Sequence, residues 1–328
     1  MIKTGRIFWG IFLALAMILP ADAFNGSLRT LRQETGVYRL LTDVAARYNW
    51  KCSAPSNGPA RIGSNAGWFE FRPGGKNARW NGKILSLNFA AFRDQNGSWW
   101  IHDTDLYRSL LPLLEPETPP RKIRRIILDP GHGGTDPGAK GKETQLQEKR
   151  VNLAVAQRVA KHLQKAGLEV IFSRAGDDTV ALQRRPELVT AHNADLFVSI
   201  HQNSATNRKA SGIETFVATP ENCASTHQQE TAKPAAAAIG NRFDDASLQL
   251  AVEIQRRAVD YTGAADRGVK RSRFVVVRES DCPAVLIECG FLSNAGEESR
   301  MMQEEWMDRI SRAIADGICA FSGMEAAQ

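Results

Sequence analysis

The sequence predicts an α/β fold, in which a mostly parallel or mixed sheet carries helices on both faces, preceded by a small α+β domain. Two observations lead to this prediction. From residue 124 onward, short apolar segments alternate with longer segments whose apolar residues recur at helical spacing. The segment 195–200 is almost wholly apolar, which is typical of a strand buried on both faces of a sheet.

Composition agrees with a folded protein. The chain has 328 residues, of which 43% are apolar and 24% are charged, and this excludes disordered, collagen-like and coiled-coil classes for most of its length. Lys and Arg exceed Asp and Glu by 42 to 36, so a polyanionic or cell-surface partner is compatible with the charge without being required by it. Five cysteines are too few for a disulfide scaffold, and no CxxC pair indicates a zinc knuckle or redox motif.

Residues 1–23 have the features of a secretory signal. Lys3 and Arg6 form a basic start, an apolar run follows over 7–20, and Ala21-Asp22-Ala23 resembles a cleavage site. A transmembrane anchor is the alternative, but a run of about 14 residues is shorter than the roughly 20 that a bilayer requires. We therefore expect an exported protein, in a periplasm or the cell wall space, with no membrane contact after cleavage.

A proline-rich stretch, 115–122, is the predicted linker between a domain at 28–114 and a second domain at 123–322, because three prolines interrupt helix and strand alike. In the first domain we expect a helix at 37–47, a hairpin of 68–71 with 78–80, a strand at 84–92 and a helix at 103–113. Its five tryptophans are expected to pack in the core, with stacking against sugar rings as the alternative.

The second domain is predicted to alternate strands with helices in the following order. The strands are 124–128, 168–172, 195–200, 212–218, 274–277 and 284–288. The helices are 146–166, 181–193, 247–262 and 304–321. The long first helix ends at Gly167, a residue suited to a helix C-cap.

Four polar residues occur where such a sheet places its chemistry, at the carboxyl ends of strands. His132 and His201 follow predicted strands, Glu288 ends the predicted strand 284–288, and Glu148 lies in the first turn of helix 146–166. Glu148 shares a helix face with apolar positions and is expected to point inward, unlike Lys149. Two histidines and a carboxylate are typical of a catalytic zinc site, and a further carboxylate could move a proton of water. Structural histidines and a glutamate that only suits the helix dipole are the alternatives.

Other hydrolytic patterns are absent, since the sequence has no HExxH, GxSxG or GxxxxGK[ST] motif. Instead, five separated segments carry a family resemblance: LDPGHGGTDPGA at 128–139, EKRVNL at 148–153, FSR at 172–174, LFVSIHQN at 196–203 and PAVLIECGFLSN at 283–294. In these segments the chain resembles the zinc-dependent N-acetylmuramoyl-L-alanine amidases of the amidase_3 family, over nearly all of 124–321.

The resemblance implies that His132, Glu148 and His201 bind one Zn²⁺ ion and that Glu288 is the catalytic carboxylate. It also implies peptidoglycan as the substrate, cut at the amide between the lactyl group of N-acetylmuramic acid and L-alanine of the stem peptide. Asn203, two residues beyond His201 on an extended strand, is a candidate substrate contact. Asp129 and Asp136 are candidate hydrogen-bond partners of His132.

Two further segments carry expectations. The first domain resembles the copper amine oxidase N-terminal-like module, through Trp80-Asn81-Gly82 between strands and the closing helix, and this implies no copper chemistry. Some relatives carry an inhibitory helix at the position of 219–246. This segment is shorter and contains Pro220 and Pro234, so we expect a substrate-side loop, with autoinhibition through its acidic residues as the alternative.

The expected function is therefore an exported peptidoglycan hydrolase in cell wall turnover or cell separation, without a nucleic-acid partner. A protein activator stays open at this point. A zinc peptidase acting on stem peptides and a wall-binding protein without catalysis are the competing hypotheses.

Overall fold

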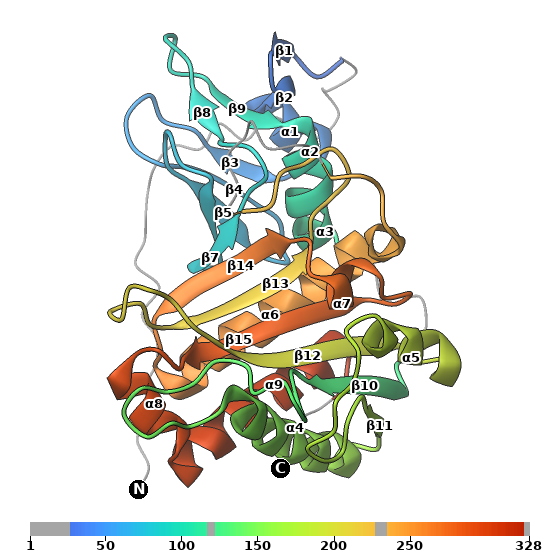
Figure 1. Cartoon of the computed structure of the whole chain (residues 1–328). Coiled ribbons are helices and arrows are strands. Elements are labelled where there is room, and N and C mark those ends of the chain that lie inside the picture. The colour runs from blue at the N-terminus through green and yellow to red at the C-terminus, as the bar shows by residue number, and fades with distance from the viewer. Residues whose placement is uncertain (1–26, 117–121, 227–234, 325–328) are drawn as a thin grey trace, which may run out of the picture.

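The computed structural model of the chain describes residues 27–116, 122–226 and 235–324 (Figure 1). The predicted signal segment and most of the predicted linker lie outside these residues, so the structure does not test either. Among the described residues, no helix is long and apolar enough to cross a bilayer.

The second half of the chain builds a mixed sheet in the order β11-β10-β12-β15-β13-β14. Its strands are β10 (Arg125–Pro130), β11 (Glu169–Phe172), β12 (Leu196–Asn203), β13 (Ile213–Ala218), β14 (Asp266–Ser272) and β15 (Ala284–Phe291). The first four in the order are parallel, whereas β13 runs antiparallel to β15 and parallel to β14. The carboxyl ends of β10, β12 and β15 therefore meet at one edge of the sheet, where β13 and β14 begin.

Helices cover both faces of this sheet, which confirms the predicted α/β class (Figure 1). On one face lie α4 (Glu148–Lys165), α6 (Asp244–Thr262) and α9 (Glu304–Phe321), and their apolar sides form the main core with β10, β12 and β15. On the other face, α5 (Arg184–His192) and α7 (Val275–Arg278) contribute to a smaller core. The short helix α8 (Ala295–Met301) follows β15.

The N-terminal part is a small α+β unit. One sheet has the order β1-β2-β9-β8, and an antiparallel meander of β3 to β7 forms the other. The strands are β1 (Thr30–Gln33), β2 (Gly36–Leu40), β3 (Lys51–Ser53), β4 (Ala60–Gly63), β5 (Trp68–Phe71), β6 (Asn77–Trp80), β7 (Lys83–Ser86), β8 (Phe92–Arg93) and β9 (Trp99–His102). The helical segments are α1 (Leu41–Arg47), then α2 (Asp103–Asp105), the π-helix η2 (Leu106–Leu110) and α3 (Leu111–Leu114) in succession.

The meander continues the second sheet, because β7 pairs with β14 at Leu85 and Val269. The sheet thereby has 11 strands. The backbone N–H of Ile84 donates to Oδ2 of Asp266 at 2.7 Å, and Nη2 of the buried Arg271 donates to the carbonyl of Arg108 at 2.7 Å. The N-terminal unit therefore covers part of the outer side of β14.

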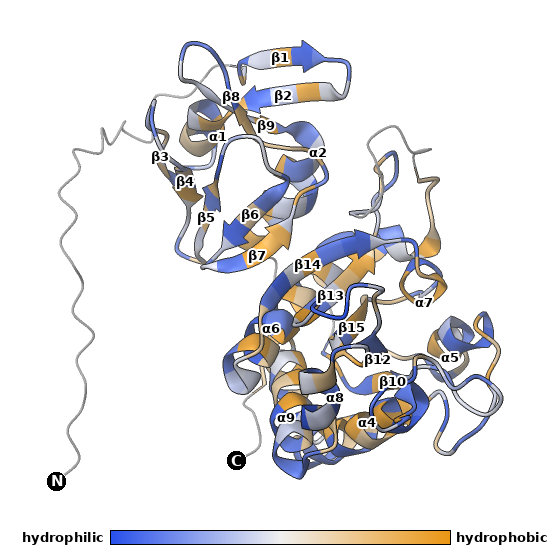
Figure 2. Cartoon of the chain, turned by 60° about the vertical axis from the view of Figure 1, so that its left-hand side comes forward, coloured by the Kyte–Doolittle hydropathy of each residue, from blue (hydrophilic) through white to orange (hydrophobic). Residues whose placement is uncertain are grey.

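Several sequence expectations for individual elements are wrong. Residues 275–278 form helix α7, and the strand expected there lies at 266–272 instead. Four of the seven residues of β14 are charged, so it has no apolar run for a pattern search to find, and Figure 2 shows it as largely hydrophilic. The expected helix at 37–47 is shortened at its start by β2, and the expected strand at 84–92 is divided into β7 and β8.

The tryptophans divide between two environments. Trp50 and Trp99 are 6% and 1% exposed and belong to the core, as expected. Trp80 and Trp100 are partly buried, whereas Trp68, at the start of β5, is 38% exposed, so the expectation of core packing is wrong for Trp68.

Candidate metal centre

A tight turn after β10 positions the first candidate ligand. His132 has a φ of 61°, and the two glycines after it have φ values of 128° and 56°. Glycine tolerates such angles without strain, whereas His132 needs outside support to hold its own. Gly131 is also required for space, because a Cβ atom there would lie 2.1 Å from Cε1 of His201.

Two buried arginines supply that support by binding the carbonyls of the turn. Arg174 donates from Nε to the carbonyl of Pro130 and from Nη2 to that of Gly131, both at 2.9 Å. Arg185 donates from Nη2 to the carbonyl of His132 at 2.8 Å. The sequence pattern predicts this role for neither residue, although Arg174 lies in the FSR segment at 172–174, because an arginine in a polar stretch or an amphipathic helix ordinarily faces solvent.

Glu148 and His201 complete a three-residue cluster. Glu148 is 4% exposed at the start of α4, which confirms its predicted inward orientation. Its Oε2 lies 3.2 Å from Nε2 of His132, and its Oε1 lies 2.9 Å from Nδ1 of His201 at the end of β12. One ligand atom from each residue falls within 4.8 Å of the other two. Three side chains far apart in the sequence thus converge at the edge where β10 and β12 end.

The neighbouring Lys149 does not point outward as expected. It is 8% exposed, and its Nζ donates to the carbonyl of Gly134 at 2.7 Å and to Oδ2 of Asp177 at 2.8 Å. The first turn of α4 is therefore buried on two sides, and Lys149 ties the glycine turn to the loop after β11.

Charges in the cluster reinforce one another. Burial opposes ionisation of Glu148, but hydrogen bonds and charges from His132 and His201 outweigh it and hold its pKa well below the usual value. Burial likewise disfavours the charged form of His132, but Glu148 and Asp136 outweigh it and raise the pKa of His132 to about 9. The cluster is a strongly polar site that favours a cation.

Glu288 lies beside this cluster, near the carboxyl end of β15, in register with His201 on one side and with Glu214 of β13 on the other. Its Oε2 is buried and has no hydrogen-bond partner among the described residues. Burial raises the pKa of Glu288 well above its usual value, and the charges of Glu148 and Glu214 add to the shift. A buried carboxyl oxygen without a partner is energetically costly, so its retention indicates a function.

Comparison with known proteins assigns this arrangement to a family. A sequence model of the Amidase_3 family, described as N-acetylmuramoyl-L-alanine amidase, matches residues 126–320. The chain belongs to the Amidase_3 family. The amidase region thus excludes the N-terminal unit and contains all four candidate residues.

Individual amidases agree with this assignment. N-acetylmuramoyl-L-alanine amidase LytC of Bacillus subtilis is 35% identical over 196 residues, which are 60% of this chain and 35% of LytC, so the chain spans about a third of that relative. The catalytic domain of the amidase CwlV from Paenibacillus polymyxa superposes with a TM-score of 0.53 at 32% identity, covering 62% of this chain and 100% of that domain. The CwlD amidase of Clostridioides difficile, solved in complex with the GerS lipoprotein, superposes with a TM-score of 0.52 at 29% sequence identity, covering 61% of this chain and 98% of that chain.

The two aspartates that were predicted as hydrogen-bond partners of His132 differ in their contacts. Oδ2 of Asp136 lies 2.7 Å from Nδ1 of His132, which leaves Nε2 of that ring toward the cluster. Asp129 does not contact the ring of His132. Instead it is fully buried and accepts hydrogen bonds from Ser173, Ser199 and Arg185. Its link to His132 runs through Arg185, which also binds the carbonyl of that histidine.

Asn203 is held by a group that the sequence analysis missed. Its Nδ2 donates to Oε1 of Glu214 at 2.7 Å, while Oε2 of Glu214 accepts from Nε of Arg267 at 2.7 Å and from Nζ of Lys270. Burial would raise the pKa of Glu214, but Lys270 and Arg267 outweigh it and hold that pKa below its usual value. A charged residue inside the otherwise apolar strand Ile213–Ala218 was the signal that could have identified it.

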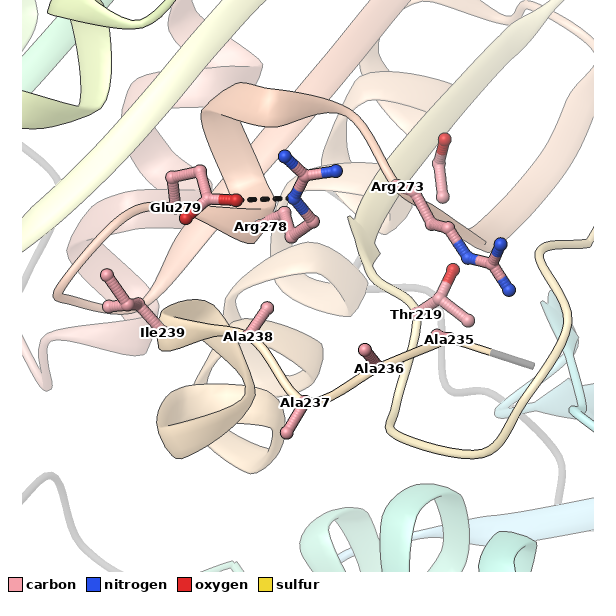
Figure 3. A pocket seen from close by; sticks show the side chains of 10 residues that line it. Thr219, Ala235, Ala236, Ala237, Ala238, Ile239, Arg273, Arg278 and Glu279 are labelled. Atoms are coloured by element: carbon pink, nitrogen blue, oxygen red, sulfur yellow. Dashed lines mark hydrogen bonds and ion pairs between the residues drawn. The ribbon is translucent and has the colours of Figure 1, made fainter. Parts of the chain in front are cut away.

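The described flanks of 219–246 begin at the opposite edge of the sheet, because β13 runs away from the metal cluster. A cavity of about 470 Å³ lies there, lined by residues that include Thr219, 235–239, Arg273 and Arg278 (Figure 3). The expectation that 219–246 is a substrate-side loop therefore does not fit its described flanks. Asp244 and Asp245, two of the acidic residues behind the autoinhibition alternative, start α6 at this edge and do not reach the metal cluster. Of the two other acidic residues of this segment, Glu221 follows β13 at the same edge, and Glu230 lies outside the described residues.

Proposed function

We propose that the chain is an exported, zinc-dependent N-acetylmuramoyl-L-alanine amidase that hydrolyses the amide between the lactyl group of N-acetylmuramic acid and L-alanine. One observation carries the proposal: His132, Glu148 and His201 converge next to the unpartnered Glu288, in a chain of the Amidase_3 family. The family name supports peptidoglycan as the substrate.

The residues fit a zinc ion. Two imidazoles and one carboxylate are a common donor set for catalytic zinc, which leaves further positions open for water and substrate. Space around the donors is preserved by glycine, since a Cβ on Gly138 would lie 2.5 Å from Oε2 of Glu148 and 2.7 Å from Cδ2 of His132. Asp136 would keep the ring of His132 in the required orientation.

When bound, zinc would polarise the amide carbonyl and lower the pKa of a water molecule. Glu288 takes the proton of the attacking water and returns it to the nitrogen of L-alanine as that nitrogen leaves. Burial raises the pKa of the Glu288 carboxyl, which makes its carboxylate form a stronger base toward a proton of water. Arg174 and Arg185 hold the turn that carries His132, and Glu214 holds Asn203 at the end of β12.

Export, location and organisation belong to the same proposal. Residues 1–23 would direct the protein to a periplasm or wall space, where it would act in wall turnover or cell separation. We further propose that 28–114 is a separate module of the copper amine oxidase N-terminal-like kind, joined by 115–122 to a catalytic domain at 123–322. The GerS lipoprotein bound to CwlD supports a search for a protein activator of this chain too.

The test is digestion of purified peptidoglycan sacculi by the full chain without residues 1–23, with and without a chelator and after zinc is restored. Mass spectrometry should find stem peptides that begin with L-alanine, released only when metal is present. The Glu288→Gln variant should bind sacculi and release at least about a hundredfold less. Glu305→Gln, an exposed substitution on α9, is the matched control and should act like the wild type.

Two other outcomes would contradict the proposal. New amino ends inside the stem peptide would show a peptidase. Binding without any release, by a wild-type protein that contains zinc, would show a wall-binding protein.

A further inference from the structure

Arg267 lies next to an irregularity at the start of β14. Between the pairs Ile213–Asp266 and Thr215–Val269, strand β13 advances by two residues while β14 advances by three. The extra residue is a β-bulge, and it includes Gly268 at a φ of 83°. Because Asp266 pairs with Ile213, Arg267 follows on the same face as Glu214. The extra residue lets Val269 return to the opposite face, where it is buried in the main core.

Its neighbours keep the bulge in place. A Cβ on Gly268 would lie 2.5 Å from Cγ2 of Ile84, so strand β7 packs directly against the glycine. Asp266, just before Arg267, accepts from the N–H of Ile84 and from Nε2 of Gln255. The position of Arg267 thus depends on the packing of β7 against β14, where the N-terminal meander meets the rest of the sheet.

Two contacts orient the guanidinium group. Its Nε donates to Oε2 of Glu214 at 2.7 Å, and its centre lies 4.7 Å from the ring centroid of Phe291 at the end of β15. Neither Nη atom forms a hydrogen bond within the described chain, and the side chain is 33% exposed. The nearby Glu297 carboxylate is engaged elsewhere, by the backbone N–H groups of Gly212 and Phe291. Arg267 therefore presents two oriented, free donors to solvent.

Glu214 connects these donors to the proposed reacting groups. Glu214, which anchors Arg267, is directly opposite Glu288 in the β13–β15 ladder, and such pairs have Cβ atoms about 5 Å apart. Glu214 also holds Asn203, two residues beyond the candidate ligand His201. Arg267 itself lies on β14, the second strand across the sheet from Glu288, with β13 between them.

The chemistry of the donors indicates what they bind. A planar guanidinium with two free Nη groups matches a carboxylate in bidentate geometry. On the sugar side of the scissile bond, the lactyl acid is consumed in the amide and carries no charge. Carboxylates occur on the peptide side, beyond L-alanine.

We propose that Arg267 binds a carboxylate of the stem peptide next to the scissile amide and thereby selects peptides with a free acid on the residue after L-alanine. The inference rests on the proposed amidase function for the identity of the ligand. Glu214 and Phe291 are positioning residues for this subsite, since they orient the guanidinium and leave its outer donors unoccupied.

The test compares two N-acetylmuramoyl dipeptides that differ in one group, a free carboxylate or a carboxamide on the residue after L-alanine. The zinc-loaded wild type should hydrolyse the acid with a kcat/KM about tenfold or more above that of the amide, the scale of one charge-assisted hydrogen bond. Arg267→Gln should hydrolyse the acid and the amide substrate at similar rates. Arg267→Lys should retain part of the preference for the acid, because lysine keeps the positive charge but cannot form the bidentate pair of hydrogen bonds.

Arg309→Gln is the matched control, because this arginine is 54% exposed on α9 and pairs with Glu305 away from the site. It should retain the wild-type ratio of the two substrates. Thermal melting of each variant separates a loss of selectivity from a loss of fold. A merely structural role of Arg267 would lower both rates together and leave their ratio unchanged.

A binding experiment distinguishes failure of this inference from failure of the proposed function. The two dipeptide ligands are titrated by calorimetry into Glu288→Gln, with Arg267 intact and with Arg267→Gln. If neither ligand is hydrolysed by the wild type but the acid still binds better only when Arg267 is present, the subsite stands and the amidase proposal fails. If Arg267→Gln keeps the wild-type preference, or if the wild type has none, the inference is overturned.

Discussion

Asp129 is the residue whose substitution tests the structure of the site most severely. Its carboxylate is fully buried and accepts hydrogen bonds from Nη1 of Arg185 at 2.6 Å, from Ser173 at 2.5 Å and from Ser199 at 2.7 Å. Arg185 is itself 5% exposed and extends to the carbonyl of His132. Asp129→Asn keeps the shape of the side chain and removes its charge, which leaves the guanidinium of Arg185 buried without its counter-ion.

The expected cost follows from this burial. Breaking a buried ion pair by removing one partner costs about 3–5 kcal/mol, because the remaining charge stays desolvated. The serine hydroxyls lose less, since the amide oxygen of asparagine can still accept one of them. At roughly 2–4 °C per kcal/mol for a chain of this size, the melting temperature should fall by about 6–20 °C.

Urea unfolding followed by circular dichroism measures the free energy, and the melting temperature gives a second value. Ser199→Ala is the control, because it removes one hydroxyl donor, keeps the ion pair and should cost about 1–2 kcal/mol. The bound zinc content of Asp129→Asn should also fall, since Arg185 supports the backbone of His132. If Asp129→Asn were within about 1 kcal/mol of the wild type, the ion pair would not have the structural role assigned here.

Three further predictions concern stability, metal binding and thiols. The pKa of Glu214 is held below its usual value, so the stability that its charge contributes is fully present above about pH 4.5 and is lost as the pH falls through the lower pKa of the folded state. In chemical denaturation, Glu214→Gln should therefore be less stable than the wild type at pH 7 and approach the stability of the wild type near pH 3. An equal difference in unfolding free energy at both pH values would contradict this. Gly131→Ala would place a Cβ 2.1 Å from Cε1 of His201 and should lower the zinc content, measured by atomic spectroscopy, to less than about half that of the wild type. The control is Gly75→Ala, whose Cβ would lie 3.9 Å from its nearest neighbouring atom, and this variant should bind zinc normally. All five cysteines are free thiols, and burial raises the pKa of Cys52 to about 11 and of Cys223 to about 12. A thiol reagent at pH 8 should therefore react slowly with the native protein and detect five thiols when the protein is denatured without reductant. Fewer than five thiols would reveal a disulfide.

The sequence was most informative where a pattern is local. Helix α9 has the bounds that were expected from its apolar periodicity, 304–321, and α4 differs from its expected bounds by two residues at the start and one at the end. The inward orientation of Glu148 followed from the helical repeat alone. Strand β14 could not be found in this way, because four of its seven residues are charged and two of these, Lys270 and Arg271, are nevertheless buried in the fold.

The candidate site shows the same division. His132, Glu148, His201 and Glu288 were all identified before the structure, because each lies in a distinctive motif at a strand end or helix start. Asp129 was placed beside His132, although the structure connects the two through Arg185. That error has a simple cause, since adjacency in sequence does not show which way an alternating strand directs each side chain.

The sequence by itself determined the fold class and the four residues of the candidate centre, since hydrophobic periodicity and strand-end motifs are properties of short segments. The tertiary structure alone decided which groups support and extend that centre. Arg185 meets Asp129 across 56 positions, and Arg267 meets Glu214 across 53. A buried charge acquires its role from its partner, and only the folded sheet brings the partners together.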